Sequence, residues 1–284
     1  MTTPSPTVRR KRLTVELRRL REQAGLTCED VGHRLECSGT RISRIETGRI
    51  GARPGDVREL LEIYGVTGAA ADSLVQLARD ARRKGWWHAY SRVLPPWLEA
   101  YVGLESDAAR LHDFQPSVVP GLLQIEDYAR AILRDAPYAD YGEDIDQQLA
   151  LRMRRQAVLD QPRPPQVRMV LGESVLWMQV GGPAVLRAQL LRLAELAARP
   201  DFSLQILPLR TAAHAQPAGP FTLLEFADPA DPTVVYLEHL TGSLLLDEDE
   251  EVQRYRAMFD HLRAAALGPG PSADLIARTA AELA

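Results

Sequence analysis

The placement of proline constrains this chain more than any other feature of its sequence. Seventeen of the 20 prolines lie between residues 95 and 271, whereas only Pro54 stands between Pro6 and Pro95. Proline breaks the interior of a helix, so the first part of the chain favours uninterrupted helices more than the second part does. A domain ordinarily contains roughly 100 to 200 residues, and the chain has 284. We therefore predict an N-terminal domain over 1–84, a linker over 85–96 and a C-terminal domain over 97–284.

The N-terminal part contains five segments in which apolar residues recur every three or four positions, as on one face of a helix. Thr27 and Ser38 are typical N-cap residues, and Asp30 completes a capping box with Thr27. Pro54 suits the first turn of a helix. The predicted helices cover 13–24, 27–35, 38–46, 54–64 and 69–83, so the fold class expected here is all-α.

The C-terminal part alternates between strand-like and helical patterns and is predicted to be α+β with a mainly antiparallel sheet. The expected strands cover 110–114, 167–171, 202–207, 221–226 and 233–237. The expected helices cover 125–134, 143–159, 183–199, 248–266 and 272–283. Short turns late in the chain favour an antiparallel meander, and Pro120-Gly121 is predicted to form a type II turn.

The net charge of -4 conceals an asymmetry along the chain. Residues 1–84 carry 17 Lys and Arg against 11 Asp and Glu, a balance of +6, while the other 200 residues carry 17 against 27, a balance of -10. A basic small domain attached to an acidic larger one is expected where one end of a protein meets a polyanion. The alternative is that the basic excess is only a solvated surface.

The second and third predicted helices are short and are separated only by Glu36 and Cys37. This spacing is typical of a helix-turn-helix, in which the second helix enters the major groove of DNA and the first crosses the backbone. We therefore predict double-stranded DNA as a partner of the N-terminal domain.

The runs 26–32 (Leu-Thr-Cys-Glu-Asp-Val-Gly) and 38–48 (Ser-Gly-Thr-Arg-Ile-Ser-Arg-Ile-Glu-Thr-Gly) closely resemble the Xre, or lambda-repressor-like, family over about 13–66. Glu46, by the same resemblance, pairs with Arg21. Gly39 occupies a reading position but has no side chain, so more of the readout falls on Arg44. The DNA-contacting residues that the resemblance implies are Thr40, Ser43 and Arg44 at bases, with Arg41 and Arg49 at phosphates.

The C-terminal part also contains recognisable short sequence motifs, among them residues 119–124 (Val-Pro-Gly-Leu-Leu-Gln) and 235–238 (Val-Tyr-Leu-Glu). They resemble the uncharacterised C-terminal domain of antitoxin-like transcriptional regulators from GC-rich bacteria, over about 97–279. The resemblance implies a regulator whose C-terminal domain receives a signal, and which is sometimes paired with a small protein from a neighbouring gene.

Four large aromatic residues are candidates for a ligand pocket or partner groove beside the Pro120-Gly121 turn. The plainer alternative is that they belong to the core, because large aromatic residues at such spacing are more often core than ligand cage. The candidates are Trp97, Phe114, Tyr128 and Trp177.

Several other classes of protein are not supported by the sequence. It contains no His-Glu-x-x-His motif, no Gly-x-Ser-x-Gly elbow and no phosphate loop, so we expect no enzyme, no metal and no cofactor. Cys28 and Cys37 are the only cysteines, which argues against a disulfide framework. With neither an apolar run long enough to span a membrane nor a signal peptide, the expected location is the cytoplasm, without a membrane partner.

These observations predict a sequence-specific transcriptional regulator that binds a DNA operator as a homodimer. One short recognition helix buries too little surface for tight specific binding, and a dimer supplies two half-sites. The C-terminal domain is expected to sense a small-molecule effector or a small protein partner. The alternative is an antitoxin-type protein that sequesters a partner and regulates its own operon.

Overall fold

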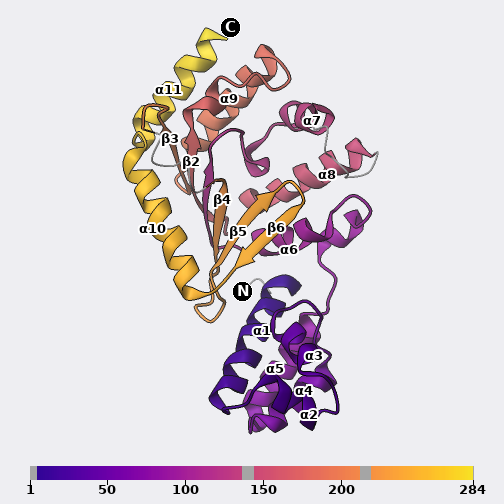
Figure 1. Ribbon diagram of the computed structural model, residues 1–284. Coiled ribbons are helices and arrows are strands. Elements are labelled where there is room, and N and C mark those ends of the chain that lie inside the picture. Colours follow the sequence, from indigo (N-terminus) through magenta and orange to yellow (C-terminus); the bar gives the residue numbers. More distant parts are fainter. Residues whose placement is uncertain (1–4, 136–143, 212–218, 284) are drawn as a thin grey trace. The chain divides into compact units, whose positions relative to one another are not determined.

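The computed structural model describes residues 5–135, 144–211 and 219–283. The chain forms two compact units (Figure 1). The first contains Met1–His88 with Asp228–Pro232, and the second contains Ala89–Ala227 with Thr233–Ala284. Among the described helices, none has the length and apolar character needed to cross a membrane.

Five α-helices build the first unit, as predicted. Helix α1 begins at Pro6 rather than Leu13, because Ser5 caps it by accepting a hydrogen bond from the Val8 N–H (3.3 Å) and Pro6 fits its first turn. The other predicted helices are confirmed to within a few residues at their ends. The five are α1 (Pro6–Gln23), α2 (Cys28–Arg34), α3 (Gly39–Glu46), α4 (Pro54–Ile63) and α5 (Gly68–Asp80).

A six-stranded sheet with the strand order β3-β2-β1-β4-β5-β6 forms the centre of the second unit. The pairs β1–β4, β4–β5 and β5–β6 are antiparallel, which confirms the predicted mainly antiparallel sheet, while β1–β2 and β2–β3 are parallel. The meander interpretation did not include this parallel half. The strands are β1 (Arg110–Gln115), β2 (Gln166–Gly172), β3 (Phe202–Leu207), β4 (Phe221–Glu225), β5 (Val234–His239) and β6 (Gly242–Leu246).

The second unit and the residues leading into it contain two helical segments that were not predicted from the sequence. Helix α6 begins at Pro96, where two consecutive prolines had suggested a linker, because a proline in the first turn leaves no helical hydrogen bond unmade. Residues Trp86–Tyr90, also within the predicted linker, form a short 3-10 helix. The α-helices are α6 (Pro96–Glu105), α7 (Glu126–Asp135), α8 (Ile145–Gln156), α9 (Pro183–Ala197), α10 (Asp249–Ala265) and α11 (Pro269–Glu282).

The two faces of the sheet have different coverings (Figure 1). On one face α10 packs against an apolar cluster that includes Phe114, Phe221 and Val235. On the other face the Tyr101 ring of α6 stacks on Tyr236 of β5, with ring centroids 4.1 Å apart. The alternation of side chains along each strand therefore sends neighbouring residues into two separate environments.

The segment after Pro120 differs from the predicted type II turn. Residues Gly121–Leu123 form a 3-10 turn in which the Leu123 N–H donates to the Pro120 carbonyl (2.9 Å). Gly121 does not have a positive φ, which a type II turn would require at this position. The prediction of that turn was wrong, and the chain instead continues into one helical turn.

Candidate nucleic-acid interface

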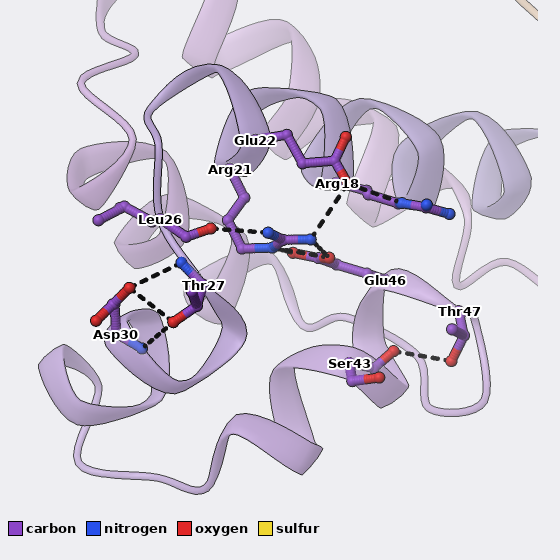
Figure 2. A network of polar contacts seen from close by, with 9 residues as sticks. All are labelled: Arg18, Arg21, Glu22, Leu26, Thr27, Asp30, Ser43, Glu46 and Thr47. Carbon is purple, nitrogen blue, oxygen red and sulfur yellow. Dashed lines mark hydrogen bonds and ion pairs between the residues drawn. The ribbon is translucent and has the colours of Figure 1, made fainter.

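Helices α2 and α3 form a helix-turn-helix whose two N-termini are capped as predicted. Thr27 accepts a hydrogen bond from the Asp30 N–H (3.1 Å), and Asp30 accepts one from the Thr27 N–H (2.8 Å), which makes a complete capping box (Figure 2). Ser38 accepts a hydrogen bond from the Arg41 N–H (3.3 Å) at the start of α3. Both helices therefore begin at defined residues, and the turn between them is short.

Two glycines allow α2 and α3 to approach closely. A Cβ atom at Gly32 would lie 2.8 Å from the Cys37 carbonyl oxygen, and one at Gly39 would lie 2.7 Å from Glu29 Oε1. The contact at Gly32 is with backbone and cannot relax easily, whereas the Glu29 carboxylate could move, but a Cβ at Gly39 would also lie 3.0 Å from the Glu29 backbone nitrogen. Gly39 therefore has a structural role in the packing of the two helices, which is consistent with its lack of a reading side chain.

The inward face of α3 anchors it to the core of the first unit. Ile42 and Ile45 are at most 2% exposed and pack in one cluster with Val31 of α2 and Leu17 of α1. Burial of each such side chain contributes about 1.5–3 kcal/mol. This packing fixes the orientation of α3 and leaves its opposite face exposed to solvent.

The residues predicted to contact DNA are all exposed: Thr40, Arg41, Ser43 and Arg44 of α3, and Arg49, which follows the end of that helix. Within the described residues, the guanidinium groups of Arg44 and Arg49 form neither an ion pair nor a hydrogen bond. Arg41 differs, because its Nη2 lies 2.9 Å from Asp56 Oδ2 of α4. The sequence analysis missed this partner, which lies in the next helix and shares no periodic pattern with Arg41.

A buried ion pair fixes α3 to α1 behind this face, as the sequence comparison implied. Arg21 donates from Nε to Glu46 Oε1 (2.8 Å) and from Nη2 to Oε2 (2.9 Å), while its Nη1 donates to the Leu26 carbonyl (2.8 Å) (Figure 2). The hydrogen bonds to Glu46 raise the pKa of Arg21. The Glu46 side chain is only 4% exposed, so its function is structural support of the helix-turn-helix.

The two cysteines lie near this pair and on the turn, and both are free thiols. Burial, reinforced by the nearby Glu46 carboxylate, raises the pKa of Cys28. A raised pKa keeps the thiol protonated and unreactive. Within the part of the chain that the structure describes, no group of His, Cys, Asp and Glu side chains is arranged to hold a metal ion.

The aromatic residues proposed to line a pocket occupy different environments in the second unit. Phe114 and Tyr128 are 2% and 0% exposed, whereas Trp177 is 50% exposed and Trp97 is half-buried. The hydroxyl of Tyr128 accepts a hydrogen bond from the Val119 N–H (3.4 Å). Their role in ligand or partner binding stays a prediction, and a cavity of about 560 Å³ in this unit is lined by other side chains.

Two known families match separate parts of the chain. Residues 98–278 match the family described as Domain of unknown function (DUF5753). The chain belongs to this family. Residues 12–74 match the family described as Helix-turn-helix domain, which covers α2 and α3. No curated protein and no solved structure matches the chain.

This DUF5753 protein therefore contains a helix-turn-helix DNA-binding domain and is a DNA-binding regulator. The family description assigns no activity to residues 98–278. The chemistry of the second unit has to be argued from its own side chains.

Proposed function

We propose that this DUF5753 protein is a sequence-specific, Xre-type transcriptional regulator. The observation that carries the proposal is the outward face of α3. There Arg44 is exposed and forms no ion pair with any described residue, while the helix beneath it is held by Ile42, Ile45 and Glu46. An exposed cation on a fixed helix that is free to enter a major groove is what base reading requires.

The side chains on this face divide between reading and positioning. Arg44 donates in a fork that fits guanine O6 and N7, and Thr40 and Ser43 have hydroxyls that suit several base edges. Arg49 suits a phosphate. Arg41 contacts phosphate by exchanging the Asp56 carboxylate, 2.9 Å away, for a phosphate oxygen.

The proposed DNA-bound form is a homodimer. Helix α3 has only eight residues. A single module of this kind buries less surface than tight specific binding requires, whereas two-fold symmetry doubles the contacts. The dimer predicts an operator with two inverted half-sites, about 34–36 Å apart or a multiple of it.

The second unit is proposed to regulate DNA binding through a bound effector rather than through catalysis. An antitoxin-type role is a second candidate, favoured by the acidic first turn of α10, where Asp249, Glu250 and Glu251 follow one another. A basic small protein recovered in equal amount with the native chain would favour the antitoxin role. Its absence from the purified native complex would favour the small-molecule role.

The proposed function is tested by selecting bound duplexes from a random DNA pool with the full-length protein. The expected result is one enriched motif with two inverted half-sites. A matched selection with Arg44→Ala is expected to lose the preference at one position in each half-site. Failure of the full-length protein to enrich any motif would contradict sequence-specific binding.

A further inference from the structure

The second unit contains a cavity of about 560 Å³ between its sheet and helices α6, α7 and α8. Pockets for small ligands usually measure about 300–1,000 Å³, so the volume is in the right range. Leu240, which is 72% exposed, contributes to the rim, and the cavity therefore reaches the surface. Residues 119–122, which include the turn at Pro120, form part of its wall.

The floor of the cavity is a row of polar side chains across three strands. Asp113 of β1 is in register with Thr222 of β4, which is in register with Tyr236 of β5, and all three line the cavity. The opposite face of the same strands carries Phe114 and Phe221 and is packed closed by α10. A buried sheet face ordinarily carries apolar residues, so this polar row is unusual for a buried face and suits contact with a polar group in the cavity.

Asp113, at the β1 end of this row, carries its carboxyl group. Its side chain accepts hydrogen bonds from Gln115 Nε2 (2.9 Å) and Thr222 Oγ1 (3.2 Å), and both bonds reach Oδ1. No described residue bonds to Oδ2, and none forms an ion pair with this carboxyl. Asp113 is only 4% exposed, so one carboxyl oxygen is available to the cavity and to little else.

The two arginines that line the cavity with Asp113 are bonded to other partners, so the carboxyl can still accept a cation. Arg155 of α8 is bound to Glu105 of α6 through both its Nε and its Nη2, the shortest contacts being 2.8 Å. Arg152 donates to Gln124 Oε1 (2.8 Å). Neither guanidinium pairs with Asp113, and Glu238 adds a second carboxylate to the lining.

The remaining neighbours that titrate are Tyr101, Tyr236 and His239. Burial raises the pKa of Tyr101 well above its usual value, so its ring stays neutral. Tyr236 donates from its hydroxyl to Glu238 (3.1 Å). The ring of Tyr101 stacks on that of Tyr236 and has the Arg155 guanidinium 5.3 Å from its centroid, so its faces are already occupied.

We propose that this cavity binds a small organic amine, with its ammonium group at Asp113 Oδ2 and its apolar part against Leu98, Leu133 and Leu151. The ligand supplies a positive charge to a carboxyl with which no described guanidinium forms an ion pair. An anionic ligand that paired with Arg155 would have to displace Glu105, which is costly for a buried pair. The signalling role of this amine rests on the proposed regulatory function, whereas the binding itself does not.

Burial raises the pKa of Asp113 to about 7, with Glu105 raising it further and Arg155 opposing the increase. Asp113 therefore loses its proton over a range in which an alkyl amine remains charged. Since the ionised carboxylate attracts the ammonium group, amine affinity should rise about tenfold between pH 6 and pH 8.

The test is calorimetry of the full-length protein without DNA, using benzylamine, 2-phenylethylamine and tryptamine as probes. The matched controls are 2-phenylethanol, which is neutral, and 3-phenylpropionate, which is anionic. At pH 8 at least one amine is expected to bind saturably, and its affinity should exceed that of both controls by at least tenfold. Tighter binding of the carboxylate, equal binding of the alcohol, or no binding of any amine at 10 mM would each overturn the proposal.

A variant then assigns the binding to the cavity. Asp113→Asn retains an acceptor for Gln115 and Thr222, and it is expected to weaken amine binding at least tenfold and to remove its pH dependence. Glu250→Gln, at an exposed position on α10, removes one negative charge elsewhere and should leave amine binding unchanged. Unchanged binding in Asp113→Asn would overturn the assignment, while the wild-type comparison of amine, alcohol and carboxylate remains informative if that variant does not fold.

The same amine added to the protein–operator complex tests signalling separately. A changed operator affinity is expected, because the amine must bind the two functional states unequally to regulate. If the wild type binds its operator but no amine, only the proposed cavity ligand is rejected. If the wild type binds no operator, the proposed regulatory function is rejected, whereas amine binding measured by calorimetry without DNA is unaffected.

Discussion

Each of the two units buries an arginine–glutamate pair, and the two pairs support different surfaces. Arg21 and Glu46 are 12% and 4% exposed at the side chain, and Arg155 and Glu105 are 11% and 2% exposed. The first pair lies beneath α3 and fixes an exposed, basic surface. In the second pair, Arg155 lines a cavity and its guanidinium lies 5.3 Å from the centroid of the Tyr101 ring. The same kind of buried ion pair therefore supports an exposed surface in one unit and lies beside a cavity in the other.

The pairs also differ in what would remain if the glutamate were lost. Arg21 keeps the Leu26 carbonyl at 2.8 Å and Glu22 at 3.6 Å. All the hydrogen bonds that Arg155 donates within the described residues go to Glu105. An unpaired buried charge is far more destabilising than a lost surface pair. The second unit therefore depends more on its pair than the first.

The largest expected effect is the loss of stability on removing Glu105. Glu105→Ala should lower the free energy of unfolding by about 3–5 kcal/mol, because Arg155 is left buried without an acceptor. Glu46→Ala should cost less, about 1–3 kcal/mol, because Arg21 retains other partners. Urea unfolding followed by circular dichroism measures both, with Glu250→Ala at an exposed pair as the control. Equal losses for Glu46→Ala and Glu105→Ala would break the comparison between the units.

The next effect is a pH dependence of stability that belongs to the second unit. The pKa of Asp113 is raised to about 7 in the folded chain, above the value of about 3.9 expected when unfolded. The folded state then binds more protons, so this contribution is complete below pH 4 and is lost as the pH rises through 7.

Asp113→Asn should remove this pH dependence, and at pH 8 it should raise the free energy of unfolding by roughly 2–4 kcal/mol relative to the wild type. Thermal unfolding between pH 4 and pH 8 provides the measurement, and Asp56→Asn in the first unit is the matched control. A wild-type profile that is unaltered by Asp113→Asn would place the titrating group elsewhere.

The smallest expected effect concerns the salt dependence of DNA binding by the first unit. Arg49→Ala should reduce the slope of log K against log salt concentration by about 0.9, the contribution of one phosphate contact. Asp56→Asn should strengthen binding to all duplexes at low salt, because it releases Arg41 from its 2.9 Å contact. Fluorescence anisotropy over a salt series checks both, with Arg254→Ala on α10 as the second-unit control. A slope that Arg49→Ala does not change would remove Arg49 from the phosphate contacts.

The helix-turn-helix could be predicted because its determinants are local. Thr27, Asp30 and Ser38 cap helices only a few residues away, and the apolar spacing of Ile42 and Ile45 shows which face is buried. The Arg21–Glu46 pair came from the family resemblance. Its 25-residue separation leaves no periodic signal.

The cavity could not be predicted because its parts are distant in the chain. Asp113 and Thr222 are 109 residues apart and meet only through the pairing of β1 with β4. A polar residue in a strand pattern ordinarily indicates a solvated face, so Asp113 resembled a surface residue in the sequence. The sequence favoured large aromatic residues as pocket candidates instead. One of them, Phe114, lies on the opposite face of the same strand, away from the cavity.

The central claim, that the outward face of α3 reads DNA sequence, is tested most directly at Arg44. Anisotropy should compare the wild type and Arg44→Ala on the selected operator and on a scrambled duplex of equal length and charge. The account predicts a loss of about 1–3 kcal/mol on the operator, with little change on the scrambled duplex, because the guanidinium contacts a base rather than a phosphate. Equal losses on the two duplexes, or no loss on the operator, would contradict it.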